Sequence, residues 1–440
     1  MRLNFVTQKL LLLSMLLFTA CVGNTDPDQI MLPTETTPPR GTKAPTLSPT
    51  ATTEIVSGTI SIWHSWNEPY VSALINTISA FQEAYPNVYF DVLYVPELDL
   101  QASFEQAAID GGGPTIVIAP DEWGPEFYKK GYIAGLSDLL APELLNTLNP
   151  AAVDRGRYQD ELMGIPLHIN GIVLYRNAVV VPGPAFTYDE LVTLAKSANK
   201  GDILGAYLDR SFNFAAAHLL SLGGILMNAE GEPAFDNEVG LRWVNLLLSF
   251  DQTGPTDFFT DNDVNAFKEG RVGFLIESTV RRNELEESVG EGYLAIDQWP
   301  IHADGHLSGF VVAENIYLSE RALDEDDMIS LEFVKFLLSP DAQSEIAAVD
   351  LIPAISGSPV NVASGKVNIP NPLIKQAMIA LTDGYAYPLS PHTSLYRDHL
   401  NQALKTVFES GESPSAALRA ASDVITEALI IGDVAPTPTP

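Results

Sequence analysis

The alternation of short strands and helices after residue 58 restricts the fold more than any other feature of the sequence. Three apolar runs rich in β-branched residues indicate strands: "GTISIW" (58–63), "VYFDVLYV" (88–95) and "PTIVIA" (114–119). One helix is predicted over residues 99–109. Another ends before Pro86 and has apolar residues on one face, namely Val71, Leu74, Ile75, Ile78 and Phe81. This β-α-β-α-β order predicts an α/β fold with a mostly parallel sheet that helices cover on both faces.

The length of the chain indicates two lobes. Residues 58 to about 432 exceed the ~250 to 300 residues at which a single hydrophobic core stops growing. An apolar content of 46% favours a fully globular body. The net charge of −32 disfavours nucleic acids and anionic surfaces as partners. The densest acidic run, Asp324–Asp327, is interpreted as the exposed start of a helix.

The N-terminal segment predicts export. The apolar run Leu10–Phe18 follows basic residues and is shorter than the roughly 20 residues needed to cross a bilayer, so residues 1–20 are interpreted as a signal peptide. Phe18–Cys21 resembles the lipobox of bacterial lipoproteins, and Cys21 is the predicted acceptor of a diacylglycerol. Because Cys21 is the only cysteine, a disulfide within the chain and a cysteine metal site are excluded.

Two segments rich in proline and threonine flank the predicted globular body. Residues 21–57 begin at the modified cysteine and continue as a Pro/Thr tract, and residues 433–440 end in "APTPTP". Such tracts offer little apolar surface to offset the entropy of ordering. They are predicted to form a disordered tether and a disordered tail.

Polar side chains follow three of the predicted strands. They are His64–Glu68 after the first strand, Asp121–Trp123 after the third, and Glu277–Thr279 after "RVGFLI" (271–276). Ligands of open parallel sheets bind at the carboxyl ends of the strands. Tryptophan stacks on sugar C–H surfaces, while carboxylates and amides bind hydroxyls. These segments therefore favour a polar uncharged ligand such as a sugar.

Each tryptophan also has a packing interpretation. Trp66 and Trp123 either line the ligand site or act as ordinary packing aromatics, and the sequence leaves both possibilities open. Trp63 and Trp243 lie in apolar strand and helix patterns, so we assign them to the core.

Several segments, in order along the chain, resemble the family of extracellular solute-binding proteins of ABC importers typified by maltose-binding protein. The similar segments include "ISIWHSW", "GGGPTIVIAPDEW", "YQDELMGIPLHINGIVLYRNAV", "AFKEGRVGFLIES" and "SGFVVAENIYLS". The likeness covers roughly residues 58–430.

The resemblance implies a two-lobed α/β fold whose lobes are joined by hinge crossings and close over a ligand. Residues 58–168 and 308–352 would form the N-terminal lobe, and residues 169–307 and 353–432 the C-terminal lobe. The implied function is to capture a mono- or oligosaccharide, without catalysis, cofactor or metal, and to deliver it to an ABC permease. The protein is expected to be a monomer, anchored by its lipid to the outer face of the cytoplasmic membrane.

By matching positions, the resemblance and the strand ends together place the ligand between residues of both lobes. The expected ligand-binding residues are Trp66, Asn67, Asp121, Glu122, Trp123, His168, Asn170, Phe212, Asn213, Glu277, Ser278, Thr279, Trp299 and Tyr396.

Two other functions compete with import. A surface glycoside hydrolase would draw its two carboxylates from Asp121, Glu122 and Glu277. A sensor would use the same closing trap to report to a membrane receptor.

Two further segments have both a ligand and a structural interpretation. "IHADGHL" would bind a metal through His302, Asp304 and His306, but its Asp-Gly pair also predicts a turn between two strands. Arg281–Arg282 would attract an anionic ligand, but nearby Glu284, Glu286 and Glu287 favour ion pairs within a helix.

Overall fold

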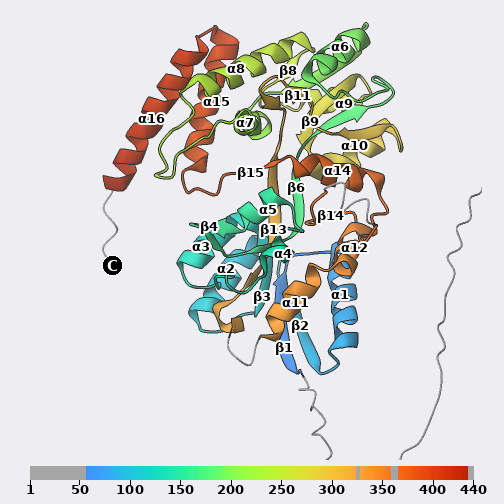
Figure 1. The fold of residues 1–440 in the computed structure, drawn as a ribbon, viewed down its shortest axis with the longest axis vertical. Coiled ribbons are helices and arrows are strands. Elements are labelled where there is room, and N and C mark those ends of the chain that lie inside the picture. The colour runs from blue at the N-terminus through green and yellow to red at the C-terminus, as the bar shows by residue number, and fades with distance from the viewer. Residues whose placement is uncertain (1–55, 324–327, 358–364, 435–440) are drawn as a thin grey trace, which may run out of the picture. The chain divides into compact units, whose positions relative to one another are not determined.

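A computed structural model of the protein describes residues 56–323, 328–357 and 365–434 (Figure 1). The predicted signal peptide, Cys21, nearly all of the tether and the acidic run Asp324–Asp327 lie outside these residues. The last helix, α16 (Pro414–Val434), includes the first two residues of the predicted tail. No helix in the described ranges combines the length and the apolarity needed to cross a membrane.

The predicted β-α-β-α-β order is confirmed at the start of the described chain. It consists of β1 (Gly58–His64), α1 (Tyr70–Ala84), β2 (Val88–Tyr94), α2 (Glu97–Ile109) and β3 (Ile116–Pro120). Strand β1 pairs in parallel with both β2 and β3. On α1, Leu74 and Ile78 are buried as predicted, but Ile75 is 45% exposed. The reason is that Ile75 lies about 100° around the helix from Leu74.

Strand β3 shows that helices cover both faces of this sheet. Ile116 and Ile118 belong to the apolar core that also contains residues of α1 and α11 (Ile329–Leu337). Val117 and Ala119 belong to a second core with residues of α2 and α3 (Gly124–Lys129). Because side chains alternate along a strand, the two cores lie on opposite faces of the sheet. In Figure 1, α2 and α3 lie on one side of the strands and α1 and α11 on the other.

A second set of parallel strands comprises β9 (Val272–Ser278), β7 (Leu204–Asp209) and β8 (Thr256–Asp257). We call the part built on β1, β2 and β3 the N-terminal lobe and the part built on β7, β8 and β9 the C-terminal lobe. The residue boundaries expected from the sequence stay a prediction. The helices of the C-terminal lobe are α6 (Tyr188–Ala198), α7 (Phe212–Ser221), α8 (Glu238–Ser249), α9 (Asn262–Lys268), α10 (Arg282–Val289), α14 (Pro372–Thr382), α15 (Thr393–Ser410) and α16.

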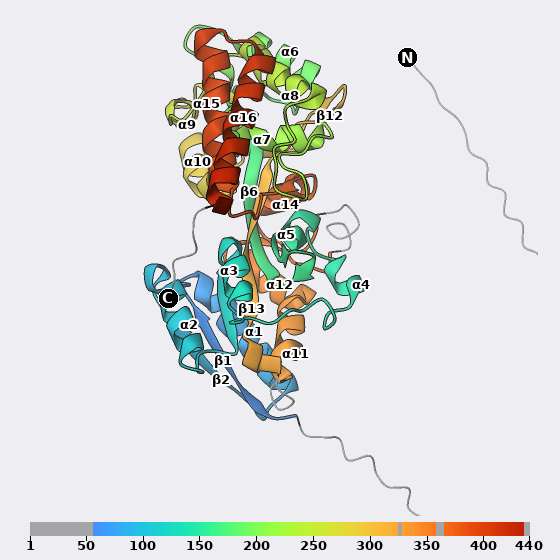
Figure 2. The ribbon, with the colours of Figure 1, turned by 90° about the vertical axis from the view of Figure 1, so that its left-hand side faces the viewer.

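Two long strands, β6 (Ile165–Asn177) and β13 (Phe310–Leu318), connect the lobes. They join the two sets of strands into one sheet in the order β2-β1-β3-β13-β6-β9-β7-β8. Strand β6 is antiparallel to β13, to β9 and to the short strand β14 (Ile352–Pro353). Figure 2 shows β6 and β13 between the two lobes. The crossings are therefore part of the sheet and not separate loops.

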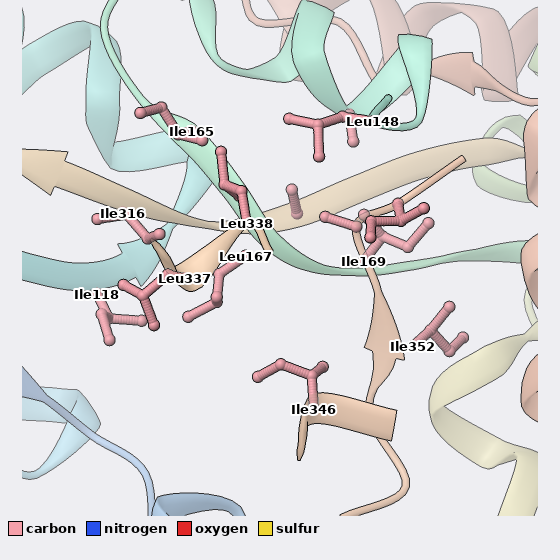
Figure 3. Close-up of a cluster of buried hydrophobic side chains, with 14 of the residues drawn as sticks. Ile118, Leu148, Ile165, Leu167, Ile169, Ile316, Leu337, Leu338, Ile346 and Ile352 are labelled. Carbon is pink, nitrogen blue, oxygen red and sulfur yellow. The ribbon is translucent and has the colours of Figure 1, made fainter. Parts of the chain in front are cut away.

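An apolar cluster holds the crossing strands in place (Figure 3). Ile165, Leu167 and Ile169 of β6 contribute to it. Its other labelled members come from β3, β13, β14, α11, α12 (Pro340–Ala348) and neighbouring segments, namely Ile118, Leu148, Ile316, Leu337, Leu338, Ile346 and Ile352. Close packing of this kind fixes where the polar residues of the crossings emerge.

Shorter elements complete the described chain. They are η1 (Asp121–Trp123), α4 (Pro142–Leu145), α5 (Pro150–Arg155), β4 (Arg157–Tyr158), β5 (Glu161–Leu162), η2 (Phe250–Gln252), η3 (Thr279–Arg281), β10 (Leu294–Asp297), β11 (Ile301–His302), β12 (Gly305–His306), η4 (Glu320–Leu323) and β15 (Tyr385–Ala386). The predicted hairpin at Asp304-Gly305 is confirmed, because β11 and β12 pair antiparallel across it. The assignment of Trp243 to the core is also confirmed, and Trp63 packs partly buried against a core.

Candidate functional site

A cavity of about 470 Å³ lies where the two lobes and the crossings meet, and we call it the Trp66 pocket. Its volume falls within the range of small-molecule sites, roughly 300 to 1,000 Å³. Most of its lining side chains are polar. The lining residues are Ser65, Trp66, Asn67, Tyr70, Glu97, Pro120, His168, Asn170, Thr279, Val280, Arg282, Asn283, Val312, Ala313, Glu314, Asp350 and Leu351.

Trp66 is positioned by the end of β1. Its backbone N–H donates to His64 Nδ1 at 3.0 Å, and its indole Nε1 donates to Glu314 Oε2 at 2.7 Å. The ring centroid lies 5.7 Å from that of His168, and the residue is only 6% exposed. Trp66 therefore packs into the core and lines the pocket at the same time, so the two interpretations of this residue describe different faces of one side chain.

Glu314 is the central side chain of the pocket, and the sequence analysis missed it. Its Oε2 accepts hydrogen bonds from Trp66 and from His168 Nε2, the latter at 2.6 Å. Burial lowers the pKa of His64, an effect that the nearby Glu314 carboxylate partly offsets. The available signal was a carboxylate in the middle of the apolar segment "GFVVAENIYLS", since an acidic residue inside a buried strand is uncommon.

The C-terminal lobe reaches the pocket through the turn after β9. The hydroxyl of Thr279 donates to Asn170 Oδ1 at 3.0 Å and accepts from Gly171 N at 3.1 Å. The side chain of Ser278 accepts from Val280 N at 3.3 Å and so caps the short helix η3. These bonds tie β6 to the C-terminal lobe, and Asn170 is itself a lining residue of the pocket.

Glu277 lies beneath this turn and is only 5% exposed. Its Oε1 accepts from Ser278 N at 2.5 Å, and its Oε2 lies 3.6 Å from Arg281 Nε. Burial raises the pKa of Glu277 to about 7, although the hydrogen bond from Ser278 N and the charge of Arg281 oppose the shift. The carboxylate is thus adjacent to the pocket-lining turn but is not itself part of the lining.

Asp121 forms a buried ion pair with Arg155. Arg155 Nε donates to Asp121 Oδ2 at 2.6 Å, and Arg155 Nη2 also donates to the other carboxylate oxygen. The backbone N–H of Ala313 donates to Asp121 Oδ2 at 2.6 Å. Ala313 lines the Trp66 pocket and Arg155 lines a second cavity, so Asp121 stands in the wall between them.

The second cavity has a volume of about 610 Å³, and we call it the Tyr387 pocket. It is also lined from both lobes, by Glu122, Pro125, Glu126, Lys129, Lys130, Arg155, Tyr387, Pro388, Leu389, Ser390, Pro391, Thr393, Ser394 and Arg397. The hydroxyl of Tyr387 donates to Asn213 Oδ1 at 3.2 Å, and its backbone oxygen accepts from Arg155 Nη1 at 2.7 Å. Two predicted site residues, Glu122 and Asn213, are thus at or next to this cavity.

Four predicted site residues pack into cores and line neither pocket. Phe212 and Tyr396 are fully buried in the C-terminal lobe, and Trp299 is 5% exposed there. The Tyr396 hydroxyl donates to Gly231 O at 2.7 Å. Trp123 is half-buried, with its ring 6.1 Å from that of Phe127. Trp123 lies in η1 directly after β3, and Phe212 begins α7 shortly after β7, so in both cases a helical turn near the strand end directs the ring toward an apolar core.

The structure shows which contacts are made by the residues of the possible metal site and by Arg281 and Arg282. Asp304 pairs with Arg242 at 3.6 Å and His306 Nδ1 bonds Leu307 O at 2.6 Å, and across the described ranges no three histidine or acidic side chains are grouped to hold a metal. Arg281 pairs with Asp261 at 3.0 Å and lies 3.8 Å from Glu284, as the ion-pair interpretation predicts. Arg282 instead donates to Asn283 Oδ1 and to Asp350 O, because its side chain turns into the protein.

A two-lobed α/β fold with a polar cavity between its lobes is the arrangement of solute-binding proteins that close over a ligand. Residues 76–367 match the family of bacterial extracellular solute-binding proteins, and the chain belongs to this family.

Solved structures confirm the fold. An extracellular solute-binding protein of Staphylococcus aureus in complex with maltose is similar with a TM-score of 0.72 and 17% identity, over 86% of this chain and 99% of that one. The cyclic alpha-maltosyl-1,6-maltose binding protein of Arthrobacter globiformis gives a TM-score of 0.71 at 17% identity, over 85% and 99% of the two chains. At this identity the likeness concerns the fold alone.

Curated relatives are distant. A maltotriose-binding protein of Pyrococcus abyssi is 24% identical over 138 residues, and the match spans 31% of this chain and 30% of the relative. A binding protein of Brucella abortus is 19% identical over 367 residues, which are 78% of this chain and 86% of the relative.

Proposed function

We propose that this protein binds a small neutral solute, a mono- or oligosaccharide, in the Trp66 pocket and delivers it to an ABC import permease. The observation that carries the proposal is that one polar cavity is lined by the N-terminal lobe, the C-terminal lobe and both crossings. Two comparisons support the ligand class, since one relative is a maltotriose-binding protein and one similar structure contains maltose.

The pocket offers the groups that a sugar requires. Asn67 and Asn283 are exposed amides on opposite lobes, and Glu314 supplies a carboxylate from β13. Tyr70 and Trp66 provide aromatic surface for C–H groups. A ligand that contacts both lobes stabilises the arrangement in which the lobes approach each other, so the bound shape itself becomes the signal for a membrane partner. No reaction on the ligand is needed.

The Tyr387 pocket bears on the length of the ligand. Glu122 and Asn213 would contact only a solute long enough to pass the wall formed by Asp121 and Arg155. A mono- or disaccharide would use the Trp66 pocket alone.

A thermal-shift screen tests the proposed function. Mono-, di- and oligosaccharides are compared with polyols, amino acids and glycerol phosphates as controls. A true ligand at 100 times its dissociation constant adds about 2.7 kcal/mol to the free energy of unfolding. A thermal shift with at least one sugar, together with recovery of that sugar chemically unchanged after incubation, supports a binding protein. A shift with anions alone would overturn the ligand class, and turnover of the sugar would favour the hydrolase.

The predicted lipid anchor on Cys21 belongs to the same proposal. A single acyl chain gives marginal binding to a bilayer, whereas two or three chains give stable anchoring. A Cys21→Ser variant expressed in a bacterial host is expected in the medium or the soluble periplasmic fraction. The anchor assignment fails if the variant stays with the membrane at the wild-type level.

A further inference from the structure

The free oxygen of Glu314 faces a pocket with an excess of carboxylates. Of the two oxygens, Oε2 is bonded to Trp66 and His168, and among the residues described Oε1 has no hydrogen-bond partner. The side chain retains 16% exposure, so it is neither sealed in the core nor free in solvent. An ionised carboxylate oxygen can only accept hydrogen bonds. Oε1 is thus available to a ligand hydroxyl.

The backbone explains why this carboxylate reaches the pocket. Strand β13 pairs with β3 on one side and with β6 on the other, where Glu314 lies opposite His168. The register against β6 shifts between Glu314 and Asn315. Val312 and Glu314 lie two residues apart on β13 and therefore share a face of the sheet, and both line the pocket.

The other charged groups of the pocket leave Glu314 Oε1 without a cationic partner. Glu97 and Asp350 are further carboxylates in the lining, and Arg282 is the one arginine or lysine among the described lining residues. Arg282 is only 4% exposed, and its Nη2 donates to Asn283 Oδ1 at 3.0 Å and to Asp350 O at 2.9 Å. His168 Nε2 lies 2.6 Å from Glu314 Oε2, the oxygen that Trp66 also bonds, so it is not a partner of Oε1.

We propose that Glu314 makes the Trp66 pocket select neutral sugars over acidic sugars of the same stereochemistry. This inference rests on the proposed function, because it assumes that sugars bind in this pocket. A ligand hydroxyl donates to Glu314 Oε1, whereas a ligand carboxylate near the same oxygen meets a like charge in a poorly solvated site. Like charges brought together in such a site repel each other, which weakens binding of the acid.

Matched pairs of sugars test the selection. Glucose and glucuronate, galactose and galacturonate, and mannose and mannuronate are titrated into the wild-type protein at pH 7 by calorimetry. The wild type is expected to bind the neutral member of at least one pair about 10-fold or more tightly than the acid. Glu314→Gln, which keeps the shape and removes the charge, is expected to reduce that ratio by about 10-fold.

Two control variants distinguish the effect of the Glu314 charge from the effect of changing the side chain at that position and from the effect of changing the net charge of the protein. Glu314→Asp keeps the charge and is expected to keep the exclusion of the acid. Glu143→Gln removes the same charge from an exposed site on α4, outside both pockets, and is expected to leave the ratio unchanged. Circular dichroism confirms that each variant is folded.

The outcomes distinguish the two proposals. If a neutral sugar binds and Glu314→Gln leaves the ratio at the wild-type value, the selective role of Glu314 is overturned while the sugar-binding function stands. If an acid binds more tightly than its neutral partner, the selective role is likewise overturned. If a sugar of the thermal-shift screen binds but no neutral member of a pair does, the selective role is overturned while the sugar-binding function stands. If no sugar of the pairs or of the screen binds the folded wild type, the proposed function and the inference built on it both fail.

Discussion

The Trp66 pocket and the Tyr387 pocket both lie between the lobes, yet they differ in how their charged groups are used. In the Tyr387 pocket, Lys130 pairs with Glu126 at 2.7 Å and with Glu105 at 2.9 Å, and Arg155 is paired with Asp121. In the Trp66 pocket, Glu314 keeps one oxygen without a partner among the described residues. Lys130 and Arg155 of the larger cavity are thus held in ion pairs within the protein, whereas Glu314 of the smaller cavity keeps one oxygen for a ligand. We therefore place the proposed ligand site by hydrogen-bonding capacity and not by volume.

Substitution of Asp121, which stands in the wall between the two pockets, is expected to have the largest effect on stability. Asp121→Ala leaves the guanidinium of Arg155, which is 2% exposed, without its carboxylate, and it removes the acceptor of Ala313 N–H. Removing one partner of a buried ion pair typically costs about 3–5 kcal/mol. Urea unfolding of the ligand-free protein should show this loss.

A double variant provides the control for the wall. Asp121→Leu combined with Arg155→Met replaces the pair by apolar side chains and should recover most of the lost stability. A single variant that loses less than about 1 kcal/mol would show that water reaches Arg155 and that the wall is open.

The two tryptophans that follow N-terminal strands allow a direct comparison of affinity. Trp66→Ala removes a ring that lines the pocket, so sugar affinity should fall about 5- to 150-fold, which corresponds to about 1–3 kcal/mol. Trp123→Ala removes a ring that packs near Phe127 and lines neither pocket, so affinity should change less than about twofold while stability falls. Calorimetry with the sugar that gives the largest thermal shift measures both. Equal losses of affinity would place Trp123 at the ligand.

The hydrogen bonds of Thr279, which link β6 to the C-terminal lobe, should contribute less to stability than the Asp121–Arg155 pair. Thr279→Val keeps the shape but leaves Gly171 N–H without its acceptor in a buried position. An unsatisfied buried donor costs about 1–3 kcal/mol of stability. Thr193→Val, on the exposed face of α6, is the matched control and should change the free energy of unfolding by less than about 0.5 kcal/mol. Equal effects of the two variants would contradict a structural role for the Thr279 hydroxyl.

The pH dependence from Glu277 is expected to be the smallest effect. Burial raises its pKa from the ordinary value of 4.5 to about 7, so between these pH values the folded protein holds a proton that the unfolded chain releases. Stability from this group is therefore present below about pH 4.5 and is lost as the pH rises through about 7. Urea midpoints at pH 5 and pH 8 should differ more for the wild type than for Glu277→Gln. The same difference in both proteins would show that Glu277 ionises as freely when folded as when unfolded.

Local sequence patterns predicted the fold well where one segment carries the information. The first five elements follow from β-branched runs and from the spacing of Leu74, Ile78 and Phe81 on α1. Trp66 and Asn67 were found because they directly follow a strand, where ligands of open sheets bind. The same rule failed to separate Trp66 from Trp123, since both follow strands but only one ring reaches a cavity.

The sequence by itself determined the parallel α/β architecture, the two-lobed organisation and the polar segment after β1. The tertiary structure decided which predicted residues meet. Asp121 is 34 residues from Arg155 along the chain, and Trp66 is 248 residues from Glu314, yet both pairs share hydrogen bonds. Periodicity reports the face of a single element, whereas these contacts depend on how β13 and β6 are seated by the apolar cluster at the crossings. Packing across the crossings, and not any local motif, places Glu314 in the pocket.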